Sequence, residues 1–334
     1  METPIIQIQN LIKQYGDVTA VNDLTLSIRK GEVFGLLGPN GAGKTTTTLM
    51  LLGLSEPTSG HAYVGGIDCT RNPIQVKRSV GYLPDNVGFY TDMTGRENLR
   101  LTGSMNGMKG QALEERISLL LSKVGMTESA DRKTSTYSKG MKQRLGIADI
   151  LVKDPEVLIM DEPTNGIDPK GMRELITLIR SLAEKEEKTI LISSHQLYQI
   201  QQICDRVGIF VKGKLIACGR IDELSKQLEG ARGHTLELRV EHSDTALEAL
   251  IRGMDGVKDA ELEDATWMVT AEKDISGEII KSVVEHGYLV THARQRSNDL
   301  DEIYAQYFKE AGDNDAASEN AARSRSEKKS RRKK

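Results

Sequence analysis

A glycine-rich segment near the N-terminus constrains the fold more than any other part of the chain. It follows an apolar run at residues 32–37, typical of a buried strand, and precedes a helical pattern from Thr45 to about Leu52. Glycines at this spacing let backbone N–H groups surround a phosphate, and the following helix points its positive end at the same place. The segment therefore predicts a nucleotide-binding α/β fold. The candidate phosphate-binding residues are Gly38, Pro39, Asn40, Gly41, Ala42, Gly43, Lys44, Thr45 and Thr46.

Four side chains in two segments suit the reacting end of a nucleotide. We expect Lys44 to reach the β- and γ-phosphates and the Thr45 hydroxyl to hold Mg²⁺. About 115 residues later, the apolar strand predicted over Val157–Met160 ends in two carboxylates, Asp161 and Glu162. Because side chains alternate along a strand, Asp161 would contact the Mg²⁺ shell while Glu162 polarises an attacking water. The carboxylate pair adds hydrolysis to the predicted nucleotide binding.

Two further motifs indicate the family. The stretch Tyr137-Ser138-Lys139-Gly140-Met141 is a Ser-x-Gly turn that opens a helix, which makes a second anion site. His195 follows the next predicted strand, Thr189–Ser193. In this order and spacing, the motifs resemble those of the ATP-binding cassette (ABC) ATPases over residues 1 to about 230.

The resemblance implies roles for residues outside the phosphate loop. Tyr15 matches an aromatic residue that stacks on adenine, and His195 matches a histidine that contacts the γ-phosphate. Ser138 and Gly140 match a signature turn that binds the γ-phosphate of ATP held by a partner subunit. Asp168 matches a loop that crosses the dimer interface. Three of these assignments have structural alternatives. Asp168 precedes Pro169 as a helix N-cap does, a lone tyrosine such as Tyr15 often serves packing, and a histidine at the end of a strand, such as His195, is usually structural.

The chain departs from the family pattern at two places. Asp85 stands where the family usually has glutamine; its carboxylate could ligate Mg²⁺ but cannot donate as an amide does. In the signature turn, Lys139 and Met141 replace a glycine and a glutamine, so Lys139 either assists the partner's phosphate or points to solvent. Both changes resemble a branch of ABC ATPases made as separate subunits for sodium, drug and peptide-antibiotic exporters. That branch commonly carries a small domain after the cassette.

The organisation of the chain follows from length and patterning. Its 334 residues suggest about two domains. We expect an ABC cassette at 1–230, with a RecA-like mixed sheet core of the P-loop NTPase type and a helical subdomain at about 94–153. A βαββαβ pattern predicts a small α+β, ferredoxin-like domain at 231–310, which ends in an amphipathic helix at 299–309. Residues 311–334 have the composition of a disordered tail.

Charge and hydropathy exclude several classes of protein. No apolar stretch approaches the length of a membrane span, and no secretory signal is visible, so we expect a cytoplasmic protein. Residues 311–334 carry eight basic and four acidic residues, which leaves the rest of the chain at a formal charge of −7. An acidic body is a poor match for nucleic acid, so no specific nucleic-acid partner is expected. The tail could contact anionic lipid headgroups, bind RNA loosely or only be solvated.

The resemblance also implies partners. One cassette supplies half of each ATP site, so the expected unit is a homodimer, or a heterodimer with a related ATPase. Polytopic permease subunits would hold it at the cytoplasmic face of the membrane. We expect them to dock in a groove between the sheet core and the helical subdomain, near residues 85–94, where Phe89, Tyr90 and Met93 could form an apolar contact. The alternative is that these three side chains only pack within the cassette. We therefore expect an ATPase, with ATP and Mg²⁺ as cofactors, that energises an exporter. The alternatives are an ABC ATPase acting on ribosomes or DNA, and an importer ATPase with a regulatory C-terminal domain.

Overall fold

The chain divides into two units, each with its own hydrophobic core. The computed structural model describes residues 4–221, 223–224 and 234–296. The first unit ends at Arg220 and the second begins at Ile221. The helix predicted at 299–309 and the tail predicted at 311–334 lie outside the described residues. The domain limits at 230 and 310 therefore stay predictions.

The first unit is built on a six-stranded sheet in the order β10-β9-β3-β8-β7-β6. The strands from β9 to β6 run parallel, and β10 pairs antiparallel with β9. Every residue of β3, β7 and β8 is buried, as expected where helices cover both faces of a parallel sheet. The predicted mixed sheet core is confirmed. The strands are β3 (Val33–Leu37), β6 (Val80–Leu83), β7 (Val157–Asp161), β8 (Thr189–Ser194), β9 (Arg206–Val211) and β10 (Lys214–Gly219).

A second, antiparallel sheet in this unit has the order β2-β1-β4-β5. Its apolar residues and those of the six-stranded sheet belong to one core, which includes Ile8, Leu24, Phe34 and Ile159. The strands are β1 (Ile6–Tyr15), β2 (Val18–Ile28), β4 (Ser59–Val64) and β5 (Ile67–Asp68).

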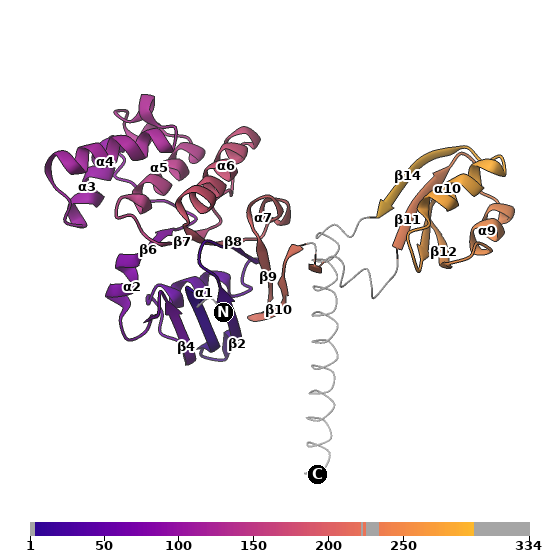
Figure 1. The fold of residues 1–334 in the computed structure, drawn as a ribbon, viewed down its shortest axis with the longest axis horizontal. Coiled ribbons are helices and arrows are strands. Elements are labelled where there is room, and N and C mark those ends of the chain that lie inside the picture. The colour runs from indigo at the N-terminus through magenta and orange to yellow at the C-terminus, as the bar shows by residue number, and fades with distance from the viewer. Residues whose placement is uncertain (1–3, 222, 225–233, 297–334) are drawn as a thin grey trace, which may run out of the picture. The chain divides into compact units, whose positions relative to one another are not determined.

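Helices cover the six-stranded sheet and fill the connection between β6 and β7. In that connection, α3, α4 and α5 pack together, and α5 also packs against β6 (Figure 1). The first of them begins at a capping box, in which the Thr94 hydroxyl accepts from the Glu97 backbone N–H and the Glu97 carboxylate accepts from the Thr94 backbone N–H. No helix in the described ranges is long and apolar enough to cross a membrane. The helices are α1 (Lys44–Leu51), α2 (Pro73–Ser79), α3 (Gly95–Met105), α4 (Gly110–Lys123), α5 (Lys139–Leu151), α6 (Pro169–Glu186) and α7 (Leu197–Ile203).

The second unit has a four-stranded sheet in the order β12-β13-β11-β14, with all pairs antiparallel. Together with the βαββαβ sequence of elements, this order is that of a ferredoxin-like unit. Its core includes Leu238, Trp267 and Val283, and the Trp267 indole N–H donates to Ser243 Oγ at 3.1 Å. The elements are β11 (His234–Val240), α9 (Thr245–Arg252), β12 (Val257–Glu263), β13 (Thr266–Ala271), α10 (Ser276–Glu285) and β14 (Val290–Arg296).

Candidate functional site

The glycine-rich loop connects β3 to α1, as the sequence predicts. Gly41 and Gly43 have φ angles of 81° and 103°, in the left-handed region that favours glycine. A Cβ atom on Gly43 would lie 2.3 Å from the carbonyl oxygen of Ala20. Both the backbone conformation and the close approach of β2 therefore require glycine at position 43.

Replacing Gly43 with alanine should destabilise the fold and the loop together. The strained φ alone costs on the order of 1–3 kcal/mol, and the contact with Ala20 adds to it. We expect a lower melting temperature and weaker ATP binding. Gly41→Ala is the matched control for strain. Gly41 also has a positive φ, but a Cβ atom added there would meet no heavy atom within 4 Å. Equal melting temperatures for the two variants would contradict the role given to the Ala20 contact.

A cavity of about 320 Å³ opens at this loop, where the carboxyl ends of the parallel strands meet. Most of the predicted phosphate, carboxylate and metal residues line it, together with Ala20. The lining does not include seven other predicted site residues, which are Gly38, Ala42, His195, Tyr15, Ser138, Gly140 and Asp168. The predicted residues that do line it are Pro39, Asn40, Gly41, Gly43, Lys44, Thr45, Thr46, Asp85, Asp161 and Glu162.

Lys44 is held firmly within the loop. Its side chain is 6% exposed, and its Nζ atom donates to the carbonyl oxygens of Gly38 and Pro39 at 2.6 and 3.0 Å. The same Nζ lies 3.6 Å from Glu162 Oε1. Burial lowers the pKa of Lys44, while the charges of Glu162 and Asp161 act in the opposite direction. The carboxylates thus favour the charged amine that a phosphate would need.

Asp161 ends β7 opposite Ser193 of β8 and is almost fully buried. Thr45 Oγ1 donates to Asp161 Oδ2 at 3.0 Å, and the Ser193 hydroxyl donates to Asp161 Oδ1. No cluster of three or more His, Cys, Asp or Glu side chains suited to a metal occurs in the described part of the chain. Mg²⁺ bound with a nucleotide needs fewer, since phosphates and waters complete its octahedron. The hydroxyl of Thr45 and the carboxylate of Asp161 therefore fit a nucleotide-associated Mg²⁺.

Glu162 lies between Lys44 and His195. Its Oε2 atom is 2.9 Å from His195 Nδ1 and accepts a hydrogen bond from the His195 backbone N–H at 3.4 Å. The Glu162 backbone has φ of 48° and donates to the carbonyl oxygen of Ser193 at 3.0 Å. A left-handed glutamate directly after a strand is uncommon, and such conformations concentrate at functional sites. The side chain is 12% exposed, so the carboxylate is oriented from both sides yet reaches the cavity.

The remaining predicted residues lie outside this cavity. Ser138 caps α5, accepting from the Met141 backbone N–H at 3.2 Å, and Asp168 caps α6, accepting from the Gly171 N–H at the same distance. The Tyr15 ring is half exposed, with its hydroxyl 3.3 Å from Ser55 Oγ. The capping role of Asp168 is therefore real, and the interface role of Ser138, Gly140 and Asp168 and the adenine role of Tyr15 stay predictions.

Sequence reasoning missed two polar residues of the site. Ser193 orients Asp161, and Asn165 Nδ2 donates to Asp85 Oδ1 at 3.3 Å. Ser193 is the last residue of one predicted strand, and Asn165 follows the carboxyl end of another, so their positions carried a signal. Their partners depend on strand order, which the patterns do not specify.

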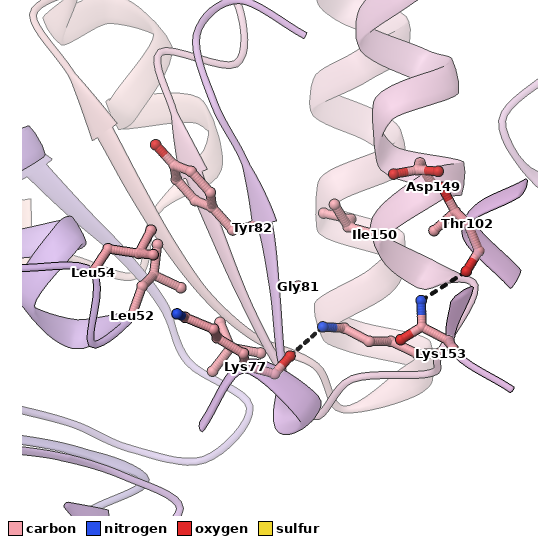
Figure 2. A pocket seen from close by; sticks show the side chains of 11 residues that line it. Leu52, Leu54, Lys77, Gly81, Tyr82, Thr102, Asp149, Ile150 and Lys153 are labelled. Carbon is pink, nitrogen blue, oxygen red and sulfur yellow. Dashed lines mark hydrogen bonds between the residues drawn. The ribbon is translucent and has the colours of Figure 1, made fainter. Parts of the chain in front are cut away.

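Two adjoining cavities lie between the sheet core and the inserted helices. The larger, of about 330 Å³, has Leu52, Leu54 and Tyr82 on one side and Thr102, Asp149 and Ile150 on the other (Figure 2). The smaller, of about 240 Å³, shares Tyr82, Thr102, Asp149 and Ile150 and adds Phe89 and Tyr90. Burial raises the pKa of Asp149, and its Oδ1 atom has no hydrogen-bond partner among the described residues. We call the two cavities together the subdomain groove.

Known proteins resemble this chain over most of its length. A family profile described as "ABC transporter" matches residues 21–165. The bacitracin transport ATP-binding protein BcrA of Bacillus licheniformis is 37% identical, over 90% of this chain and 96% of that protein. The linearmycin resistance ATP-binding protein LnrL of Bacillus subtilis (strain 168) is 34% identical, over 88% of this chain and 95% of that protein.

Solved structures agree on the fold of the first unit. That of cbiO1 from Clostridium perfringens, part of the ABC transporter complex cbiONQ, is 26% identical with a TM-score of 0.62, and the match covers 68% of this chain and 95% of that one. A dimeric post-hydrolysis state of the cassette MJ0796, bound to ADP and Pi, has a TM-score of 0.60 at 23% identity, covering 65% and 98%. The relatives that match nearly end to end, the phosphate loop and the ordered carboxylates lead to one conclusion. The chain belongs to the ABC transporter family, as an ATP-binding ATPase subunit.

Proposed function

We propose that this protein is the ATPase of an exporter, in which it drives transport through separate membrane subunits. The observation that carries the proposal is the similarity to BcrA and LnrL, proteins of bacitracin transport and linearmycin resistance, over about nine-tenths of the chain. A probable multidrug transporter protein of Escherichia coli, YbhF, is 38% identical over 67% of the chain but is covered only to 38% of its own length. Export is thus inferred from the full-length relatives.

In the proposed reaction, the residues of one chain bind and orient the nucleotide. The loop N–H groups and Lys44 bind the phosphates, and Thr45 and Asp161, with Asp85 beside them, would hold Mg²⁺, which neutralises phosphate charge. Glu162 would take the proton of the attacking water, and His195 holds its Oε2 atom in place. Tyr15 would stack on the adenine. The products are ADP and phosphate.

We assign the turn around Ser138 and Gly140, and Asp168 after it, to the surface that completes the site of a second cassette. The Met141 N–H is already used by the Ser138 hydroxyl, but the first turn of α5 still points its positive end outward. Ser138 is exposed, so a partner's phosphate could reach it. The proposed unit is a homodimer, or a pair with a related ATPase, at the cytoplasmic face of the membrane.

The subdomain groove is the proposed dock for the membrane subunits. Tyr90 at its rim is 62% exposed, which is more than packing within the cassette would leave. Phe89 lines the groove, whereas Met93 does not, and Asp149 offers an oxygen that lacks a donor. A segment that carries an apolar side chain and a hydrogen-bond donor would match these features.

Copurification tests the exporter proposal and its dock together. From membranes of the source cells, the protein should bring down a polytopic subunit, and Tyr90→Glu should reduce the yield at least several-fold by placing a charge in an apolar contact. Tyr198→Glu is the matched control, because Tyr198 of α7 is 63% exposed and outside the groove. Recovery of a ribosomal or DNA complex without a membrane protein would contradict the proposal. If Tyr90→Glu and Tyr198→Glu reduce the yield of the membrane subunit equally, the docking site does not lie in the subdomain groove.

For the basic segment at 311–334, we propose contact with anionic lipid headgroups. Eight basic residues each contribute about 1 kcal/mol near such a surface, less as salt rises. Deletion after Gly312 should therefore weaken binding to phosphatidylserine vesicles and remove its salt dependence, while binding to neutral vesicles stays the same. Unchanged sedimentation with anionic vesicles would leave the segment only solvated.

A further inference from the structure

Asp85 and Lys139, two of the three residues at which the chain departs from the family pattern, meet in the structure. Lys139 Nζ lies 4.0 Å from Asp85 Oδ1 within the same chain. Neither residue is near the other in sequence: Asp85 follows β6, and Lys139 is the first residue of α5. A lysine that pointed only to solvent would make no such contact.

A third segment holds the pair in place. Asn165, after β7, donates its amide to the same Asp85 oxygen at 3.3 Å. The Lys139 side chain crosses Gly166, so closely that a Cβ atom there would lie 3.1 Å from Nζ. Gly166 has φ of 69°, which also favours glycine. The ends of two neighbouring strands and the start of α5 thus converge on one carboxylate.

The charges of the two residues are suited to each other. A cation in the first turn of a helix faces the positive end of the helix dipole, so Lys139 benefits from an anion beside it. Asp85 lines the cavity where phosphates would bind, so its carboxylate benefits from a cation that offsets repulsion. The contact supplies both needs at once. A glutamine and a glycine at these positions would carry no charge and need no such partner.

We propose that Asp85 and Lys139 are a positioning pair that connects the nucleotide cavity of a chain to the Ser138–Gly140 turn of the same chain. Lys139 neutralises Asp85 beside the bound phosphates, and Asp85 fixes the start of the turn offered to a second cassette. A change of charge in the cavity thereby acts on the turn. This inference rests on the proposed ATP site, and it assigns Lys139 to its own chain.

The test is ATP binding by the monomer, measured by titration at a protein concentration where light scattering shows no dimer. Lys139 lies outside the cavity lining, yet Lys139→Gln should weaken ATP binding, because Asp85 loses its neutralising partner. The expected loss is about 2- to 5-fold, the range for a half-exposed charge pair. In an Asp85→Gln background, the same Lys139→Gln change should have no effect. Lys139→Arg should restore affinity. Lys142→Gln, which removes another lysine of the same helix, should leave it unchanged.

Each outcome decides the matter. A Lys139→Gln effect of equal size with and without Asp85 would overturn the pair, as would no effect in either background. Melting temperatures within about 1–2 °C of the parent would show that a loss of affinity is not a loss of folding. If Lys139→Gln does not fold, Lys139→Arg and Asp85→Glu test the pair instead. Both substitutions keep the two opposite charges, so ATP affinity should stay near the parental value, and a large loss in either would overturn the pair. If the unaltered protein fails to bind ATP, the proposed function falls and not only the pair.

Discussion

Glu162→Gln should abolish steady-state ATP hydrolysis while ATP binding persists. The amide is of the same size and still accepts the His195 backbone N–H at Oε, but it cannot take a proton from water. Loss of a positioned general base lowers rates by about 10²- to 10⁴-fold. Phosphate release gives the rate, and titration with ATP gives the affinity. With hydrolysis blocked, ATP-bound dimers should also accumulate, because ATP favours the dimer and is no longer converted to ADP.

The control for this prediction is Glu184→Gln. Glu184 is an exposed carboxylate on α6 that pairs with Arg180, far from any cavity residue in sequence. Its rate should match that of the unaltered protein. Parental turnover by Glu162→Gln would mean that Glu162 is not the base, and loss of ATP affinity would mean that the substitution damages the cavity and not only the proton transfer.

Lys44→Ala should remove measurable ATP binding. Hydrogen bonds from a charged group each contribute roughly 1.5–3 kcal/mol when buried, so losing the amine should weaken ATP binding on the order of 100-fold or more. The substitution also removes the cation beside Glu162 and the two bonds that Lys44 donates to Gly38 and Pro39. The loop then loses its internal brace as well as its phosphate contact.

A second buried lysine separates these effects from a general loss of stability. Lys188 is 9% exposed and donates to Asp154 at 2.9 Å, outside the cavity. Lys188→Ala should lower the melting temperature as much as Lys44→Ala does or more, with ATP affinity intact. ATP binding by Lys44→Ala at parental affinity would overturn the site itself.

Local patterns were enough to find the elements that carry the chemistry. The strand predicted at 157–160 is β7, and the strand predicted at 189–193 is β8, because short apolar runs are typical of strands buried on both faces. The βαββαβ order expected after residue 231 is also the order of elements in the second unit, where buried residues alternate with less buried ones along β11 and β13. Motif spacing then placed Lys44, Thr45 and Asp161 in one cavity.

What the sequence left open depends on long-range pairing. The β4 strand, Ser59–Val64, contains Gly60 and His61 and pairs with β1 across a register shift, so it has no clean alternation. The direction of Lys139 was equally undetermined, because its partner Asp85 follows a strand that lies elsewhere in the chain. Both depend on strand order, which neither propensity nor periodicity encodes.

The separation of the chain into two cores has a calorimetric consequence. One core includes Phe34, Met50 and Ile159, whereas the other is built around Leu238, Trp267 and Val269, so each can melt in its own transition. A ligand stabilises only the folded state that binds it, by an amount set by its concentration relative to its dissociation constant. ATP should therefore raise the melting temperature of the first unit alone. The second unit contains the only tryptophan of the chain, so tryptophan fluorescence should report an unfolding temperature that nucleotide does not change.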